Sequence, residues 1–478
     1  MIKRIWPLLC ASALLAACTV GPDYRRPEVE VPQKWRIEYP AATEVANTAW
    51  WEQFGDPVLN ELIETALRDN RDVRIAAARV DQFAGALQST RSQFYPQFGY
   101  GADAARNRAS RVGQPPLPPG ADPYFSLYQG ALSASWQIDL FGRVQRLSEA
   151  AQAQVYASEQ ARRGVVLTLT TSVASSYIVL RSFDRQLEIA RATSANFAET
   201  LRIFNLRFTA GMVSQTEVSQ VQSQFEQAQA AIPLIEQQIA ALENLLSVLL
   251  GRNPGPILRG RALAQLQVPA LPADLPSALL LRRPDILQAE QFLIAANANI
   301  GAAQAQYFPT LSLTGLLGSV STALGDWLSG PATAWSVAAG LTGPIFTGGA
   351  IEGQVASAQA GERAALALYQ QTILNALREA NDALVGTQKR QQEAAAQARR
   401  VEALREFARL SQLRFDQGVS SYLEVLIAEN ELFAAELAAV NSSAQRYTQL
   451  VGVYQALGGG WVDLAAQRAQ QPLASAPK

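Results

Sequence analysis

One pattern occurs twice in this 478-residue chain and fixes its organisation. Leu206 to Val218 reads LRFTAGMVSQTEV, and Leu413 to Val425 reads LRFDQGVSSYLEV. Both copies fit L-R-F-x-x-G-x-x-S-x-x-E-V at an offset of 207 residues (413 minus 206), which identifies an internal repeat. The pattern predicts two structurally similar halves.

Each copy is expected to be the tight turn of a long helical hairpin. Runs rich in Ala, Gln, Glu and Leu precede and follow both copies. Gly211 and Gly418 are typical of helix C-termini, because glycine adopts the left-handed conformation without a steric penalty. Ser214 and Ser421 are each followed three residues later by a glutamate, which predicts a capping box at the start of the next helix.

The first 17 residues have the pattern of a secretory signal. Lys3 and Arg4 precede an apolar stretch from Ile5 to Ala17, which is too short to span a membrane as a mature helix. The tetrad Leu-Ala-Ala-Cys, ending at Cys18, is typical of bacterial lipoproteins and predicts that Cys18 is the lipidated first residue of the mature chain. The alternatives are an ordinary signal with a chance cysteine, or a short buried helix. Thr19 follows, and it is not the aspartate that signals inner-membrane retention.

Composition excludes several function classes. The chain has no His, and its 40 Lys and Arg against 41 Asp and Glu create no basic field for nucleic acid. No disulfide is expected, because Cys10 leaves with the signal and Cys18 carries lipid. No paired-carboxylate, Ser-Lys, phosphate-loop or metal-ligand pattern stands out, so no enzyme activity, cofactor or metal is predicted. Beyond Cys18 no apolar run approaches the roughly 18 residues of a membrane helix, so any crossing would use strands.

Four segments show the alternation of β-strands. In the first half, 98–104 alternates, and in the run after Tyr124 apolar Leu132 and Trp136 alternate with polar Ser133 and Ser135. The second half repeats this order between Leu311 and Leu341. Each half therefore predicts a hairpin with one apolar and one small-polar face.

Helical patterns occupy most of the remaining chain. Asp56-Pro57 is a typical N-cap and N1 pair, and the cluster Trp50, Trp51 and Phe54 must be buried. The helices are predicted over 57–70, 72–94, 143–208, 215–251, 276–281, 284–307, a long run ending at Phe415, and a shorter one ending near Leu457.

These elements predict a mainly α protomer with a membrane β-barrel part. Four strands cannot close, and open sheet edges are not tolerated in lipid, so three protomers giving a 12-stranded barrel are expected. The same assembly would gather the helical hairpins into a tube. The predicted boundaries are 1–17 signal peptide, 18–55 lipidated N-terminal tether, 56–251 first repeat, 252–275 linker, 276–458 second repeat, and 459–478 flexible C-terminal tail.

The chain resembles outer-membrane efflux channels of the TolC/OprM type, in particular the NodT lipoprotein branch. The likeness covers Cys18 to about Trp461 and is carried by short motifs: Cys18 to Tyr24 with Arg26-Pro27, Trp50-Trp51 with Phe54 to Pro57, Trp136 with Asp139 to Gly142, Leu275 to Asp285, Tyr307 to Pro309, and the two LRFxxG turns. The resemblance implies a homotrimer in the outer membrane of a Gram-negative bacterium, with a β-barrel in the membrane and a periplasmic α-helical barrel. It further implies that the linker 252–275 lies in the equatorial belt around the helical barrel. It also implies docking to a periplasmic adaptor protein and an inner-membrane pump of RND type.

The two turns are the candidate functional site. Glu217 and Glu424 resemble positions where family members carry entrance carboxylates, with Arg207, Arg414 and Asp416 as candidate hydrogen-bond partners in a periplasmic gate. The competing interpretation is that both glutamates only cap their helices. The expected adaptor-contact residues are those at the two tips: Gly211, Met212, Val213, Gly418, Val419 and Ser420.

The function expected from these features is a passive exit duct for drugs or other small molecules. A duct for protein or peptide secretion would share the architecture. A lipid-anchored structural coiled coil is the third alternative, although such a stalk would not need the two amphipathic hairpins.

Overall fold

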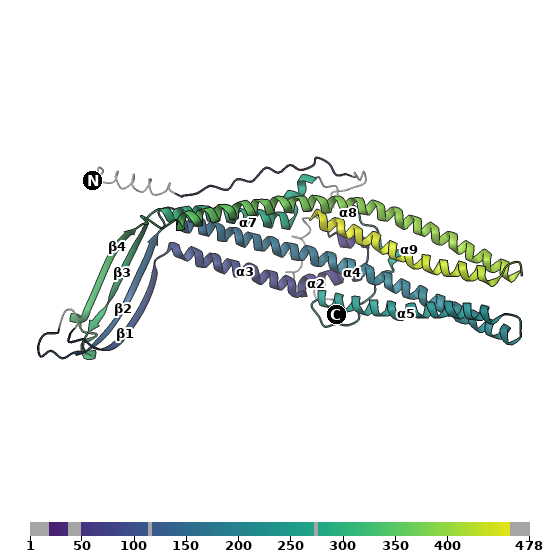
Figure 1. Cartoon of the computed structure of the whole chain (residues 1–478), viewed down its shortest axis with the longest axis horizontal. Coiled ribbons are helices and arrows are strands. Elements are labelled where there is room, and N and C mark those ends of the chain that lie inside the picture. The colour runs from purple at the N-terminus through teal and green to yellow at the C-terminus, as the bar shows by residue number, and fades with distance from the viewer. Residues whose placement is uncertain (1–18, 37–48, 113–116, 272–275, 459–478) are drawn as a thin grey trace, which may run out of the picture. The chain divides into compact units, whose positions relative to one another are not determined.

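The computed structural model describes residues 19–36, 49–112, 117–271 and 276–458. The predicted signal peptide, Cys18 and the C-terminal tail lie outside these residues. The chain divides into two compact units, whose elements are labelled in Figure 1. Unit 1 comprises the described parts of Met1–Glu28, Val80–Ser158 and Ala289–Tyr369, and unit 2 those of Val29–Arg79, Glu159–Gln288 and Gln370–Lys478. Each unit draws segments from both halves of the sequence repeat.

Unit 1 contains one antiparallel sheet of four strands. The strands are β1 (Gln97–Arg108), β2 (Tyr124–Ile138), β3 (Thr310–Ser321) and β4 (Thr333–Thr342), paired in the order β1-β2-β3-β4. All four predicted strands are confirmed. The pairing of β2 with β3 joins the two hairpins into a single sheet, which leaves β1 and β4 at its edges (Figure 1).

The register places large apolar side chains in a row across one face of the sheet. Tyr100 lies opposite Leu132, Leu132 opposite Leu317, and Leu317 opposite Trp335. Their exposed fractions are 89%, 62%, 55% and 74% in that order. Apolar side chains of this size rarely stay exposed in a row on a soluble protein, so this face is suited to contact with lipid.

The other face of the sheet carries small and polar side chains. Ser133 lies opposite Gly99 and Leu316, and Leu316 lies opposite Ser336. Leu316 is the apolar member of this row and is 42% exposed. The predicted separation of an apolar face from a small-polar face is therefore confirmed, because alternation along a strand is preserved across every pairing in the sheet.

The helices lie close to their predicted bounds. α4 (Arg143–Thr209) and α8 (Ala350–Asp416) have 67 residues each, about 100 Å at 1.5 Å per residue. The other helices are α2 (Pro57–Asp69), α3 (Arg71–Arg91), α5 (Gln215–Leu249), α6 (Leu279–Arg282), α7 (Pro284–Gln304) and α9 (Tyr422–Leu457). Short 3-10 turns at Trp50–Phe54, Ser92–Phe94, Leu263–Gln265, Pro276–Ala278, Ala305–Tyr307, Leu324–Asp326 and Gly330–Ala332 complete the elements.

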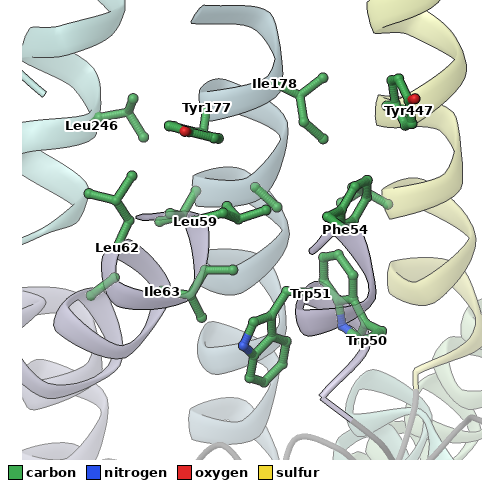
Figure 2. Close-up of a cluster of buried hydrophobic side chains, with 14 of the residues drawn as sticks. Trp50, Trp51, Phe54, Leu59, Leu62, Ile63, Tyr177, Ile178, Leu246 and Tyr447 are labelled. Atoms are coloured by element: carbon green, nitrogen blue, oxygen red, sulfur yellow. The ribbon is translucent and has the colours of Figure 1, made fainter. Parts of the chain in front are cut away.

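The core of unit 2 forms around the tryptophan pair, as predicted. Trp50, Trp51 and Phe54 are fully buried, and they pack among side chains of α2, α4, α5 and α9 (Figure 2). The Trp50 ring stacks on Tyr454 with centroids 5.0 Å apart, and Phe54 lies 6.0 Å from the Tyr447 ring. Aromatic pairs of this kind add about 0.5–1.5 kcal/mol beyond the area they bury.

Asp56 does more than the predicted N-cap. Its carboxylate accepts a hydrogen bond from Val58 N at 2.9 Å, as a cap should. It also accepts from the Tyr177 hydroxyl of α4 at 2.8 Å and from Arg261 N in the linker at 2.9 Å. Since Asp56 is fully buried, these three donors satisfy a charge that would otherwise be costly to bury.

The expectation that no stretch beyond Cys18 is long and apolar enough for a membrane helix needs one correction. Among the described residues, α4 contains a stretch that is long and apolar enough by composition to cross a membrane, and more than half of that stretch is buried. The part of α4 between Val166 and Leu180 packs in the unit 2 core beside the tryptophan pair. Its apolar side chains thus have a packing role within the protein.

Candidate functional site at the paired helical turns

The first turn has the predicted geometry. Gly211 has φ +72°, and Met212 N donates to Arg207 O at 2.8 Å, which closes the end of α4. Ser214 then begins α5 with a complete capping box. Its hydroxyl accepts from Glu217 N at 3.3 Å, and the Glu217 carboxylate accepts from Ser214 N at 2.7 Å. Glu217 is therefore engaged by its own helix start.

The second turn has the same backbone but a different carboxylate contact. Gly418 has φ +74°, and Val419 N donates to Arg414 O at 2.9 Å. Ser421 is the N-cap of α9, yet its side chain makes no capping hydrogen bond, so the predicted capping box is wrong here. The Glu424 carboxylate instead lies 3.4 Å from the Arg414 guanidinium at the end of α8. The positive charge of Arg414 competes with the backbone N–H of the N-cap residue for the Glu424 carboxylate.

The other two candidate partners do not contact the glutamates in this way. The Arg207 guanidinium lies over the rings of Phe204 and Phe415, 5.8 Å from each centroid. Asp416 accepts a hydrogen bond from the Gln412 side chain at 2.8 Å. Of the candidates, Arg414 alone pairs with one of the two glutamates among the described ion pairs.

Both turns lie at the same end of unit 2 (Figure 1). An aromatic cluster joins them there. Tyr422 at the start of α9 is 4.4 Å from the Phe204 ring of α4 and 5.0 Å from Phe415 of α8. We call these three residues the tip cluster; Val218, Val221, Val425 and Leu426 pack with it. The cation–π contact from Arg207 to Phe415 is a second link between the two hairpins.

The tip cluster was not predicted from the sequence. Phe415 belongs to the repeated pattern, but the positions 207 residues away from Phe204 and Tyr422 are Ser411 and Gln215. The repeat alone therefore gave no signal for two of its three rings. The apolar spacing of Tyr422, Val425 and Leu426 on α9 is the feature that could have indicated a buried face.

The turn residues differ in exposure. Gly211, Met212, Gly418 and Val419 are exposed, with Met212 at 74% and Val419 at 64%. Val213 and Ser420 are half-buried, and Val213 packs against the residues around the tip cluster. Of the six predicted adaptor-contact residues, one glycine and one apolar side chain from each turn are therefore exposed.

A sheet with one exposed apolar face, on a chain that also carries two long helical hairpins, defines a protomer of an outer-membrane channel. The family of outer membrane efflux proteins matches the chain twice, over residues 62–252 and 275–459. The chain belongs to this family, and its fold is the TolC-like one that the sequence resemblance implied.

Individual relatives agree along nearly the full length. The solvent efflux pump outer membrane protein SrpC of Pseudomonas putida is 34% identical over 461 residues, which cover 94% of this chain and 97% of that protein. The probable outer membrane lipoprotein SilC of Salmonella typhimurium is 31% identical, with the same coverage of 94% and 97%. The crystal structure of the MtrE outer membrane channel of Neisseria gonorrhoeae matches with a TM-score of 0.84 at 30% identity, covering 93% of this chain and 99% of MtrE.

Proposed function

We propose that this protein is the exit duct of a tripartite efflux system, conducting small molecules passively from an inner-membrane pump to the exterior. The observation that carries the proposal is the two-faced sheet, whose exposed apolar row runs from Tyr100 to Trp335. Such a sheet suits a wall between lipid and a polar lumen. In this arrangement the pump supplies the energy, and this chain supplies the enclosed path.

The open edges of the sheet support a homotrimer. Backbone groups at β1 and β4 need partners in lipid, where unpaired amides are costly. If β4 of one copy pairs with β1 of the next, three copies of four strands close a 12-stranded barrel. The repeats at 56–251 and 276–458 would then each contribute one helical hairpin. Three copies would build a helical barrel from six hairpins.

The paired turns are proposed as the periplasmic gate. Within one protomer the tip cluster and the Arg207–Phe415 contact link the two hairpins, while Arg414–Glu424 links α8 to α9. Opening by separation of the hairpins would have to break the first two contacts. Carboxylates of Glu217 and Glu424 facing a narrow lumen would attract cations, as rings of acidic side chains do in cation channels.

The exposed turns are proposed as the surface that meets a periplasmic adaptor, which would connect the duct to an RND-type pump. Exposed Met212 and Val419 offer apolar contacts at the tip of each hairpin. SrpC is a solvent efflux pump outer membrane protein, and MtrE is an outer membrane channel. They favour small-molecule efflux over the alternative of protein or peptide secretion, and over an enzymatic role.

Lipidation of Cys18 is proposed from the Leu-Ala-Ala-Cys tetrad, and the description of SilC as a lipoprotein supports it. A fatty-acid probe should label the parent chain in cells. Cys18→Ser should abolish the label, and labelling that persists in this variant would contradict the assignment.

Conductance in planar bilayers tests the proposed duct. The protein purified in mild detergent should migrate at three times the protomer mass after crosslinking and should give ion channels. A structural stalk gives no conductance, and a conducting monomer would refute closure by three copies. Crosslinking in intact cells followed by purification should recover an adaptor and a pump; recovery of a secretion apparatus instead would support the peptide alternative.

A further inference from the structure

The residues that follow Cys18 lie in a defined site on the helices of unit 1. We call Thr19–Glu28 the N-terminal segment. Val20 N donates to Phe141 O at 3.2 Å, directly before α4. Thr19 lies against Gly142, where an added Cβ would come 3.1 Å from the Thr19 Cα. The segment thus begins its contacts one residue after the predicted lipid attachment.

Arg146 of α4 holds the first part of the segment. Arg146 is only 6% exposed, and its guanidinium donates hydrogen bonds to Val20 O and Gly21 O at 3.2 Å each. It also donates to the Asp23 carboxylate at 2.8 Å and to Glu149 of its own helix at 2.8 Å. Three of these four hydrogen bonds go to the N-terminal segment. The segment therefore supplies most of the acceptors that compensate the burial of this cation.

Glu290 of α7 holds the second part. It is 7% exposed and accepts a hydrogen bond from the Tyr24 hydroxyl at 3.1 Å and one from the Arg26 guanidinium. Both hydrogen bonds described for this carboxylate come from the segment. Burial and the neighbouring carboxylate raise the pKa of Tyr24 above its usual value, so its hydroxyl stays a donor. Without the segment, Glu290 would be a buried charge with neither donor.

Backbone packing between these two anchors is also specific. A Cβ added to Gly301 of α7 would come 2.6 Å from Val20 O and 2.9 Å from the Arg146 side chain. Glycine at this position therefore lets the segment approach the helix closely. A flexible tether requires neither a glycine groove nor two buried ions of opposite charge on separate helices.

We propose that α4 and α7 form a binding site for the N-terminal segment, and that its occupation fixes the lipid anchor at the start of α4. Thr19 contacts Gly142, four residues after β2 ends at Ile138, and Cys18 is bonded to Thr19. The acyl chains would then enter the bilayer beside the periplasmic ends of the strands. The docking itself is independent of lipid, whereas its consequence for the anchor rests on the proposed lipidation.

Trypsin cleavage of the full-length trimer, purified in mild detergent so that the periplasmic side is accessible, tests the docking. Arg25 is exposed and is followed by Arg26, so release of the fragment ending at Arg25 can be followed by mass spectrometry. Glu290→Gln, and separately Asp23→Asn with Tyr24→Phe, should speed this cleavage about ten-fold, because cleavage follows the population of the open segment. The segment-side variant leaves both helices intact, so it reports docking even if Glu290→Gln folds poorly.

Glu149→Gln is the matched control, since Glu149 contacts Arg146 but not the segment. Its cleavage rate should stay within about two-fold of the parent. Equal rates in the parent, Glu290→Gln and the segment-side variant would overturn the proposal.

A nitroxide on Thr19→Cys separates docking from lipidation. Because Cys18 is consumed by lipid and no other cysteine follows it, this thiol is unique in the mature chain. The label should be immobile in the parent and mobile in Glu290→Gln. The same contrast should persist in a Cys18→Ser chain exported with an ordinary signal. A mobile label in the parent refutes docking; an immobile label without fatty-acid labelling refutes only the lipid anchor.

Discussion

Arg414 at the end of α8 lies 3.4 Å from Glu424 in the first turn of α9, an ion pair that the first copy of the turn lacks among its described contacts. In that copy Arg207 lies over two aromatic rings, and Glu217 completes a capping box. The same seven identical residues of the pattern therefore support two different side-chain arrangements. In the second turn the N-cap side chain makes no capping hydrogen bond, and the glutamate faces an arginine.

This difference predicts unequal roles for the two glutamates in ion selectivity. Glu424→Gln should give a folded trimer with reduced cation selectivity, because the variant removes a charge at the proposed entrance. Its stability should change by less than about 1 kcal/mol, since both partners of the ion pair are substantially exposed. Reversal potentials in a salt gradient across a planar bilayer measure the effect.

Glu217→Gln is the comparison, and glutamine still serves a capping box. We expect a smaller change in reversal potential than for Glu424→Gln. Unchanged selectivity in both variants would remove both residues from the gate.

The two faces of β2 predict opposite outcomes for neighbouring substitutions. Leu132→Asp places a charge in the exposed apolar row and should block trimer assembly, at a cost of up to about 2–4 kcal/mol near the bilayer midplane. Ser133→Asp, on the small-polar face, should assemble normally. The yield of crosslinked trimer in outer-membrane fractions reports both; equal yields would contradict the assignment of faces.

The buried hydrogen bonds around Asp56 predict a stability loss in unit 2. Tyr177 donates its hydroxyl proton to Asp56 and accepts from Gly260 N at 2.8 Å. Tyr177→Phe removes both bonds and should cost about 1–3 kcal/mol in a denaturant titration. Tyr156→Phe on the same helix is the control, because Tyr156 is 49% exposed and should show almost no change. Equal effects would mean that the Tyr177 hydroxyl does not support the core.

Glu429 on α9 predicts a pH-dependent stability. Burial raises its pKa above the ordinary value of 4.5, so the folded state binds the proton more tightly than the unfolded state. The charged form therefore destabilises the fold above the folded pKa, and this penalty is relieved as the pH falls towards the unfolded value. Glu429→Gln should melt higher than the parent at pH 8, and the difference should vanish near pH 4.

Exposed Glu431→Gln on the same helix serves as the control for Glu429. Its melting temperature should stay close to that of the parent at both pH values. A constant difference between Glu429→Gln and the parent at pH 8 and pH 4 would show that the Glu429 charge is not the cause.

Local chemistry in the sequence predicted the helix turns, the Asp56-Pro57 helix start and the two faces of each hairpin. Period and capping residues act over a few positions, so a single chain reveals them. The pairing of β2 with β3 could not be read in this way, because alternation identifies a face but not a neighbour. Glu290 drew no attention for a similar reason, since its partner Tyr24 is 266 residues away in the chain.

The strand order also has a consequence for mixed populations of chains. Since β1 and β4 are different edges, a closed ring of three copies has three equivalent head-to-tail seams, and each seam needs both of its edges intact. A copy with a defective edge can still join sound copies at its other edge. If half of the chains in a cell carry such a defect and mix at random, only about one ring in eight is free of it. A mutation that damages β1 or β4 as a pairing edge would therefore behave as a dominant trait.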